Sequence, residues 1–431
     1  MKTLAALGLV SCALVAGSLV AVHPAPAASV DGVIRVPADE KTIQRAVDAS
    51  KPGDLVLVSP GVYKEAIVVS RAHKNIVIRG LDRATTIVDG ELSQAPGHDN
   101  GFAVHADGVA IENITARNFV TNGFFWTGID GYRGSYLTAI RNGDYGIFAF
   151  DSTHGQFDHS YASGSPDAAF YIGQCYPCDA LIVDVEGEWN GIGYSGTNSG
   201  GNLVVARSSF HDNRIGIVPN SETGEANPPQ REASIVGNHV YDNDNDQAAG
   251  IEIAQIAGGS GILVAGGRRD TVERNLVTGH SNIGIGVIPL PEKILDPSSP
   301  TARNFDARNN VIRSNVLSGN TYDLVAVTSV DDPTDGGGNC FSDNVASATV
   351  PADLQRVLPC GAPPRPFEAD VGLLAALFLS DKAPAPSFEA VALPDPPALA
   401  NMVRAKTAPT RPATHEPSIR ISVQALRTPT G

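Results

Sequence analysis

Residues 210–220 read FHDNRIGIVPN, and four other segments of the chain align with them without gaps. Each of the five opens on an apolar residue, turns on polar or small residues and resumes on an apolar strand, which in four of them begins with a Gly-Ile pair. The other segments are residues 140–150, 185–195, 277–287 and 317–327. Such a repeat decides the fold class before any single motif is considered.

The repeat extends along the middle of the chain. With looser matches included, its opening residues are Phe119, Ile140, Tyr161, Val185, Phe210, Val240, Val277 and Leu317, at steps of 21, 21, 24, 25, 30, 37 and 40 residues. Each step holds two or three short strands separated by tight corners, without a helical stretch. This pattern predicts a parallel β-solenoid, whose coils stack at the strand spacing of about 4.8 Å.

Two columns of small polar residues support this register. Two residues before the opening residue stand Asn238, Asn275 and Asn315. Three residues after it, Asn122, Asn213, Asn243 and Asn320 alternate with Gly143 and Gly164. Asn and Gly adopt the left-handed conformation that a sharp corner needs, and stacked Asn side chains form hydrogen-bonded ladders.

Composition agrees with short strands and frequent corners. The 431 residues include 44 Gly and 30 Pro; 42% are hydrophobic, 18% charged and 6% aromatic. The apolar content excludes a mainly disordered chain, and the scarcity of Met and of long charged side chains argues against a helical bundle. A formal charge of −15 argues against nucleic acid and anionic membranes as partners. The oligomeric state stays open.

The region before the repeat carries a recognisable series of motifs. They are TIQRAVDA at residues 42–49, KPGDLVLV at 51–58, PGVY at 60–63, KNIVIRG at 74–80 and TIVDG at 86–90. This series resembles the start of right-handed parallel β-helix proteins of the pectate-lyase-like superfamily. The resemblance implies an amphipathic helix that plugs the N-terminal end, and an open solenoid end does need a cover for its unpaired strand edges.

We therefore expect an all-β, right-handed parallel β-helix with an N-terminal capping helix over residues 30–361. The resemblance covers residues 33–350 and is specific for fold only, because the superfamily holds lyases, hydrolases, epimerases, tail spikes and non-enzymes. Residues 362–431 are rich in Pro and Ala. Within them, residues 367–381 are expected to form a short helix that caps the other end, and the rest a flexible tail or linker to the envelope.

The N-terminus predicts export. Lys2 precedes an apolar run over residues 4–22, and Ala25-Pro26-Ala27 is a small-residue cleavage site, so residues 1–28 are interpreted as a signal peptide cleaved near Ala27. The mature protein is then secreted or held in the cell envelope, with no membrane segment. Two alternatives stay open: a retained membrane anchor, and a lipoprotein signal in which Cys12 is lipidated.

Four further cysteines follow, and export would place them in an oxidising compartment. We expect two disulfides, Cys175 with Cys178 and Cys340 with Cys360, although four cysteines allow three pairings. The Cys175–Cys178 spacing also suits a redox motif or half of a zinc site. No helical pattern follows it and no second such pair completes a metal site, which favours a stapled surface loop.

Residues next to an inward-facing one point outward on a strand, and this places candidate chemistry. If the register holds, one outward patch contains Asp184, Glu186, His211, His239 and Tyr241. Such a set can abstract and return protons or hold a metal ion. Polysaccharide lyases and epimerases that resemble this fold use an acid, a His or Tyr base and a basic group that neutralises the uronate. For that last role we predict Arg141, two coils away.

A second face lies on the Gly-Ile strand. Its expected outward residues are Phe148, Gly193, Val218, Leu263 and Gly286, an apolar strip without a carboxylate. The insertions at residues 221–230, 245–260 and 289–301 flank this strip. They either wall a sugar-binding groove or simply cover the strip.

An acidic run offers a cation site. Asp242, Asp244 and Asp246 alternate with Asn, as in a calcium loop, but the Gly at the sixth position and the Glu at the twelfth are missing. Ca2+ is therefore the one cofactor that the sequence suggests.

The overall prediction is an exported protein that binds or modifies an extracellular or envelope polysaccharide, by uronate lyase or epimerase chemistry if it is an enzyme. The alternative is a non-catalytic envelope scaffold or adhesion protein.

Overall fold

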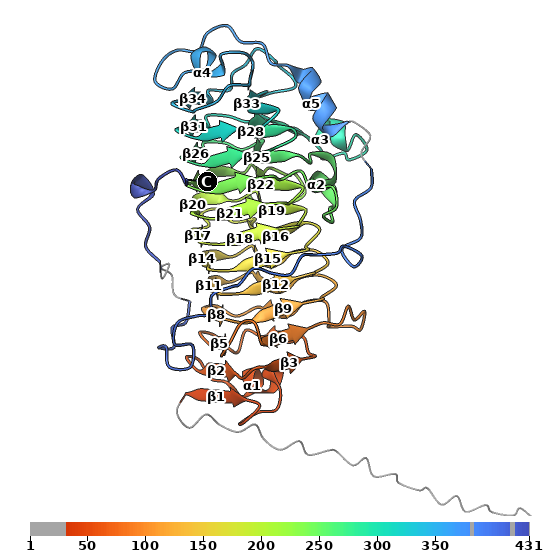
Figure 1. The fold of residues 1–431 in the computed structure, drawn as a ribbon, viewed down its shortest axis with the longest axis vertical. Coiled ribbons are helices and arrows are strands. Elements are labelled where there is room, and N and C mark those ends of the chain that lie inside the picture. The colour runs from red at the N-terminus through yellow and green to blue at the C-terminus, as the bar shows by residue number, and fades with distance from the viewer. Residues whose placement is uncertain (1–31, 380–382, 414–418, 431) are drawn as a thin grey trace, which may run out of the picture.

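The structure, a computed structural model, describes residues 32–379, 383–413 and 419–430. In this part of the chain, three parallel sheets run the length of an elongated molecule (Figure 1). We number the sheets in the order in which each coil visits them. The first corner joins sheet 1 to sheet 2, the second corner joins sheet 2 to sheet 3, and the third corner leads to the next coil. The expected signal peptide lies outside the described residues.

The bounds of the strands follow, sheet by sheet. Sheet 1 contains β1 (Val33–Val36), β2 (Leu55–Val58), β5 (Val77–Gly80), β8 (Val109–Glu112), β11 (Asp130–Ser135), β14 (Thr153–Asp158), β17 (Ala180–Val183), β20 (Gly200–Ala206), β23 (Arg231–Val236), β26 (Thr271–Glu273), β31 (Val311–Arg313) and β34 (Cys340–Ser342). Sheet 2 contains β3 (Gly61–Tyr63), β6 (Thr86–Asp89), β9 (Thr115–Arg117), β12 (Thr138–Ile140), β15 (Tyr161–Ser163), β18 (Glu186–Glu188), β21 (Ser209–His211), β24 (His239–Tyr241), β27 (Leu276–Thr278) and β32 (Val316–Ser318). Sheet 3 contains β4 (Ile67–Val69), β7 (Phe102–Val104), β10 (Phe124–Thr127), β13 (Ile147–Phe150), β16 (Ala168–Gly173), β19 (Ile192–Thr197), β22 (Ile215–Asn220), β25 (Ser260–Ala265), β28 (Ile283–Ile288), β33 (Tyr322–Ala326) and β35 (Thr349–Val350).

The remaining elements are short and lie outside the three sheets. They are the antiparallel pair β29 (Leu290–Pro291) and β30 (Asn304–Phe305), the helices α1 (Ile43–Ala49), α2 (Glu252–Ile256), α3 (Glu292–Leu295), α4 (Leu354–Val357) and α5 (Val371–Phe378), and the 3-10 helix η1 (Val423–Ala425). No helix of the described residues is long and apolar enough to cross a membrane.

The interior of the coil is a continuous apolar stack. Along sheet 3, the inward residues of four successive coils are Ile217, Ile262, Ile285 and Leu324, all fully buried. In the earlier coils aromatic rings take most of these places, and Phe102 stacks on Phe124 with ring centroids 5.2 Å apart. Each coil therefore buries its inner face against the coil above and the coil below, as a solenoid requires.

Asparagine ladders close the corners, as the sequence predicts. At the first corner, the amide of Asn238 donates to Asn275 and that of Asn275 to Asn315, both at 3.0 Å. At the second corner, Asn213 donates to Asn243 at 2.9 Å. The next member there is His280, which lies between Asn243 and Asn320. These ladders satisfy buried polar groups that a tight turn would otherwise leave unpaired.

The register of the earlier coils differs from the sequence alignment. Phe210, Val240, Val277 and Leu317 do occupy one inward column of sheet 2. In the coils before them, however, this column continues with Gly187, Ala162, Ala139 and Ala116. Val185, Tyr161, Ile140 and Phe119 were therefore aligned one to three positions away from the inward residue.

Both ends of the solenoid are covered. At the N-terminal end, α1 buries Ile43, Ala46 and Val47 and contacts β1, β2 and β4. At the other end, α4 contacts β33 and β34, and the Phe341 N–H donates to the Leu358 carbonyl. The predicted helix within residues 367–381 exists as α5, but the last strand is covered by α4, which the sequence analysis did not identify.

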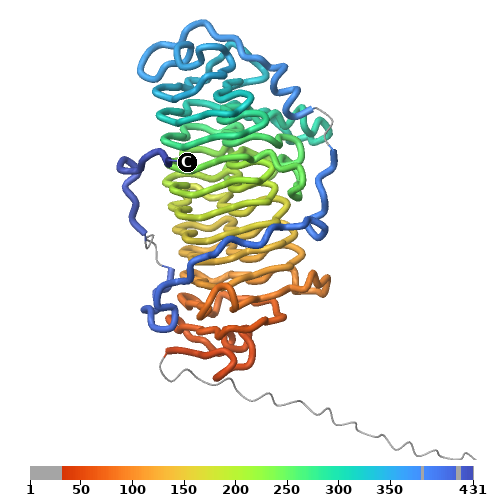
Figure 2. The backbone as a smooth tube through the Cα atoms, viewed as in Figure 1, coloured from red at the N-terminus to blue at the C-terminus, as the bar shows by residue number. Residues whose placement is uncertain are grey.

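The C-terminal tail contacts the solenoid along much of its length, in contrast to the flexible tail expected from composition. Residues 383–413, which we call the strap, pass down the solenoid and across its outer surface, and residues 419–430 return along sheet 1 (Figure 2). A Pro-rich segment has few N–H donors but a carbonyl at every residue, and arginines of the solenoid donate to these carbonyls.

The strap is held mainly by four arginines. Arg141 donates to the carbonyls of residues 388 and 389, Arg83 to that of residue 400, and Arg133 to that of residue 411. Arg79 donates to the carbonyls of residues 405, 408 and 409. Arg79 is fully buried and also pairs with Glu112 at 2.6 Å. The strap is thus part of the folded structure.

The two disulfides have the predicted pairing. Cys175 is bonded to Cys178 in the third corner between β16 and β17, and Cys340 is bonded to Cys360. The second bond ties β34 to the segment that follows α4, and so fastens the cover of the C-terminal end.

Candidate functional site

The outer face of sheet 2 gathers ionisable side chains in two columns. The strand register places Tyr161, Glu186, Ser209 and His239 side by side in the first column, and Ser163, Glu188, His211 and Tyr241 in the second. We call Tyr161, Glu186, Glu188, His211, His239 and Tyr241 the sheet 2 patch. Its members come from four successive coils, β15, β18, β21 and β24, so the rigid backbone ladder fixes their spacing.

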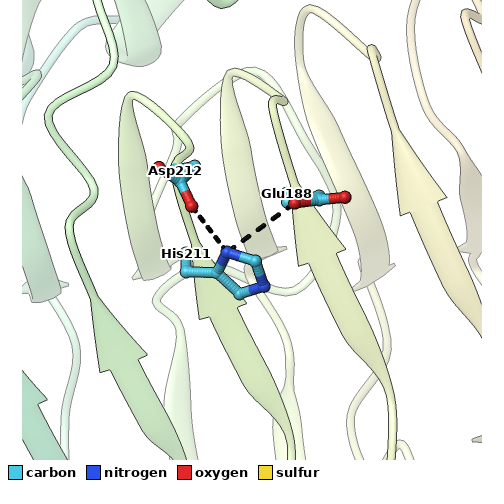
Figure 3. Close-up of side chains that lie close together, drawn as sticks. All are labelled: Glu188, His211 and Asp212. Carbon is cyan, nitrogen blue, oxygen red and sulfur yellow. Dashed lines mark hydrogen bonds and ion pairs between the residues drawn. The ribbon is translucent and has the colours of Figure 1, made fainter. Parts of the chain in front are cut away.

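His211 is the centre of this patch. Its Nε2 lies 3.2 Å from Glu186 Oε1, and its Nδ1 lies 2.7 Å from Asp212 Oδ2 and 3.8 Å from Glu188 Oε2 (Figure 3). Burial opposes the charged form of this imidazole. The hydrogen bonds to Glu186 and Asp212, together with the charge of Glu188, nevertheless raise the pKa of His211 above its ordinary value.

Tyr241 and His239 continue the patch on the next coil. The Tyr241 ring stacks on His211 with centroids 4.6 Å apart, and on His239 with centroids 4.2 Å apart. Burial and the charge of His211 lower the pKa of His239, whereas burial raises the pKa of Tyr241. Two neighbouring histidines thus have pKa values shifted in opposite directions, which is the usual basis for separate acid and base roles.

Tyr161 and Glu188 complete the network on the other side. The Tyr161 hydroxyl donates to Glu188 Oε1 at 2.5 Å, and burial together with this hydrogen bond raises the pKa of Tyr161. Neither residue was predicted as part of the site. Tyr161 was taken for an inward residue, and Glu188 was missed because Gly187, not Val185, faces inward. The alternation of Glu186, Gly187 and Glu188 is the sequence signal that marks two outward carboxylates.

Asp184 lies beside the patch rather than in it. It occupies the first corner with a positive φ of 54°, and its carboxylate accepts two hydrogen bonds from Arg207, at 2.9 and 2.5 Å. Arg141 lies in the second corner, after β12, and donates to the carbonyls of residues 388 and 389 of the strap; its predicted role in neutralising a uronate stays a prediction. Of the predicted acid–base residues, the structure brings Glu186, His211, His239 and Tyr241 together.

A groove of about 940 Å³ borders the first column of the patch. Its floor includes Glu186, Ser209 and His239 of sheet 2 and, along the first corner, Tyr136, His159, Asp184 and Arg207. Residues 397–400 of the strap and residues 425–430 form the remaining walls. The groove therefore runs across several coils and exposes part of the ionisable patch to a ligand.

The structure also bears on metal binding. Within the described residues, the one group of three or more His, Cys, Asp or Glu whose ligand atoms lie within 4.8 Å of one another is Glu188, His211 and Asp212. One imidazole nitrogen and two carboxylates suit a divalent cation. Asp242, Asp244 and Asp246 lie instead at an exposed corner and form no such group, so calcium binding there stays a prediction.

The second face predicted from the sequence is covered. The outward column of sheet 3 contains Phe148, Val218, Leu263 and Gly286, as expected, but Ser195 takes the place assigned to Gly193. Val218 and Leu263 are fully buried and belong to the same apolar cluster against which Ile253, Ile256 and Leu295 of the insertions pack. In these coils the insertions cover the strip.

Comparison with known proteins places the architecture. No protein family and no curated protein matches the sequence. Among solved structures, the A-module of the mannuronan C-5 epimerase AlgE4 from Azotobacter vinelandii superposes with a TM-score of 0.52 at 15% identity, over 75% of this chain and 94% of that one. An endo-xylogalacturonan hydrolase from Aspergillus tubingensis gives a TM-score of 0.49 at 12% identity, over 77% and 100% of the two chains.

An alginate lyase from Paenibacillus gives a TM-score of 0.44 at 14% identity, over 73% of this chain and 99% of that one. At such low identity the likeness establishes the fold alone. The chain is a right-handed parallel β-helix protein, as its opening motifs and its stacked parallel sheets indicate. Its chemistry must be argued from the site itself.

Proposed function

We propose that this chain is an exported enzyme that modifies an extracellular or envelope polysaccharide by moving the proton at C5 of a uronate. The observation that carries the proposal is the hydrogen-bonded network around His211 on an outer strand face, bordered by a groove. The likeness to a mannuronan epimerase, an alginate lyase and a polysaccharide hydrolase supports polysaccharide as the substrate class. The apolar N-terminal run with its cleavage site supports export.

The reaction requires one group that takes a proton and one that gives a proton. The hydrogen at C5 of a uronate is acidic because it is adjacent to the carboxyl group, and a base removes it. In a lyase the electron pair then forms the C4–C5 double bond, the C4–O bond breaks, and the leaving oxygen receives a proton. In an epimerase a proton returns to C5 on the opposite side of the ring. Both reactions use the same pair of groups.

The patch assigns these roles. His239, whose lowered pKa leaves it neutral near pH 7, suits the base. His211, whose pKa is raised by the carboxylates on either side although burial opposes the charge, suits the acid. Tyr241 lies between them and, because burial raises its pKa, keeps a hydroxyl that can donate a hydrogen bond. Arg207, which lines the groove, is the cation best placed to attract the carboxylate of the substrate.

The test is proton exchange at C5. The mature protein is incubated in deuterated buffer with alginate, polygalacturonate, hyaluronate and the neutral polymer dextran. Deuterium uptake at C5 is followed by NMR, and unsaturated chain ends are followed by ultraviolet absorbance. We expect one of the uronates to react and dextran to remain unchanged. His211→Gln and His239→Gln should each lower the rate by roughly 10²–10⁴-fold.

Two outcomes would contradict the proposal. His98→Gln serves as the matched control, since His98 lies in a loop remote from the patch. Full activity in both site variants would refute the assignment of the patch. A folded protein that is inactive on every polymer, with and without Ca2+, would instead favour the non-catalytic scaffold.

A further inference from the structure

The strap crosses the outer face of sheet 2 next to the patch. At the second corner, Arg141 holds the carbonyls of residues 388 and 389. At the first corner, Arg83 holds the carbonyl of residue 400, and Asn401 contacts Asp82 at 2.9 Å. The segment between these anchor points therefore spans the width of sheet 2, and the backbone tube shows it crossing the solenoid (Figure 2).

Burial of the outward residues shows which coils lie beneath this crossing. Thr115, Thr138 and Ser163 occupy the outward columns of β9, β12 and β15, yet only 5%, 4% and 2% of their surface is exposed. Ser318 of β32, which lies in the same column as Ser163, is exposed. Sheet 2 is thus covered at these positions of β9, β12 and β15, whereas the outward residues of the next coils, Glu186, Glu188, Ser209, His239 and Tyr241, are half-buried.

The crossing is fixed in place. Arg83 is 2% exposed and also donates to Thr138 and to the carbonyls of residues 137 and 159, so its guanidinium joins the strap to two coils. The Met402 N–H donates to Asn113, a corner residue that is fully buried. Loosening the strap would leave buried donors and acceptors unpaired, which is unfavourable.

From this geometry we infer that the strap forms the end wall of the substrate groove, so that the protein engages the end of a polysaccharide chain rather than its interior. Residues 397–400 line the groove at the side of Tyr136 and His159, the coils next to the covered ones. Glu186 lies one coil, about 4.8 Å, beyond the covered Tyr161. Between the wall and the patch there is room for very few sugar units.

In the opposite direction, toward β27 and β32, the outward residues Leu276, Thr278 and Val316 are half-buried and Ser318 is exposed, and the remaining sugars of a chain can continue over them. Residues 425–430 line the groove there, beside Gly237 at the first corner. A polymer can therefore reach the patch only if it terminates at the strap. This inference rests on the proposed function for the identity of the ligand. The wall itself is a separate property and has a separate test.

Binding stoichiometry tests recognition of the chain end. Alginate and polygalacturonate are each prepared at several mean chain lengths, and the protein bound per gram of polymer at saturation is measured by sedimentation. If each chain offers one terminal site, halving the chain length doubles the protein bound per gram. A value that does not depend on chain length would overturn the inference and leave the proposed function intact. Absence of binding to both polymers would contradict the proposed function.

The double variant Arg141→Ala/Asn401→Ala removes one strap contact at each of the two corners and leaves Arg83 in place. It should allow interior binding, so that the protein bound per gram no longer depends on chain length. Arg269→Ala is the matched control, because Arg269, like Arg141, is a corner residue with a positive φ but pairs with Glu232, away from the strap. The control should retain the chain-length dependence of the unmodified protein.

Accessibility tests the wall without any polysaccharide. Ser163→Cys places a thiol beneath the strap, and Ser318→Cys places one in the same column where sheet 2 is open. A maleimide should label the second rapidly and the first at least tenfold more slowly, and the Arg141→Ala/Asn401→Ala background should remove this difference. Equal labelling of both thiols in the otherwise unmodified protein would show that the wall does not exist.

Discussion

Replacing His280 by Asn should remove a large part of the acid sensitivity of this fold. His280 is fully enclosed in the second-corner ladder, where its Nε2 faces the amide of Asn243 at 3.2 Å and its Nδ1 contacts Asn320 Oδ1 at 2.8 Å. The neutral ring satisfies both contacts, because Nδ1–H donates and Nε2 accepts. A proton on Nε2 would point at the Asn243 amide donor.

Burial lowers the pKa of His280 to about 4, from 6.5 for the free side chain. Below pH 6.5 the unfolded chain therefore takes up a proton that the folded chain refuses until about pH 4. The stability contributed by this residue is complete above pH 6.5 and declines as the pH falls to 4, by about 3 kcal/mol in total. Asn at this position would continue the ladder and would not titrate.

Urea unfolding at pH 7.5 and at pH 4.5, followed by circular dichroism, measures the effect. We expect His280→Asn to cost about 1 kcal/mol or less at pH 7.5, because the side chain is smaller, and to be more stable than the parent at pH 4.5. His98→Asn, which alters a loop histidine outside the ladder, is the control. An equal loss of stability at both pH values would refute the proposed origin of the acid sensitivity.

Three further results are expected. Arg79→Met removes one partner of buried Glu112 and three donors to the strap, and should lower the free energy of unfolding by about 3 kcal/mol; a loss within experimental error in urea titrations would contradict the structural role of the strap. The rate of the proposed reaction should rise with pH as His239 loses its proton below pH 6.5 and fall as His211 loses its proton above it, and a rate independent of pH between 5 and 8 would exclude both roles. Burial raises the pKa of Asp167, the residue before β16, to about 8, so its cost to folding grows between pH 4 and pH 8; Asp167→Asn should raise stability by about 5 kcal/mol at pH 8 and leave it almost unchanged at pH 4, as thermal melts at the two pH values would show.

The fold could be predicted from the sequence because the coils repeat the same local sequence pattern. An apolar residue, a corner of Asn or Gly and a Gly-Ile strand recur, and the corner Asn residues do form ladders. The register of the earlier coils could not be read in the same way, because Gly187 and three Ala residues stand at the inward position there. Phe210 and its neighbours fill the interior, and a Cβ on Gly187 would lie 2.9 Å from that of Ala169. Where the inward residue is Gly or Ala, the sequence has no large apolar residue by which that coil could be aligned with the others.

The register of the coils also explains which site residues were predicted correctly and which were not. His211, His239 and Tyr241 were predicted because Phe210 and Val240 do face inward, and Glu186 was predicted because a shift of two positions, from Val185 to Gly187, keeps a side chain on the same face. Tyr161 was misplaced because a shift of one position exchanges the faces. The strap was missed for another reason. The arginines that hold it are scattered through distant coils, and a Pro- and Ala-rich segment has no sequence pattern that predicts which residues it contacts.

In a solenoid each coil touches only its neighbours, so the ends normally unravel before the middle. In this protein the C-terminal tail also connects coils that are not neighbours. Arg79 holds it beside β5, and Arg274, which follows β26, donates to the carbonyl of residue 423. One continuous segment thus links coils far apart along the axis, although few of its contacts are made with any one coil. The tail therefore ties coils together along the axis of the solenoid. An early coil can detach only if the tail is released too, and the molecule should melt over a narrower temperature range than a solenoid of equal length without such a tail.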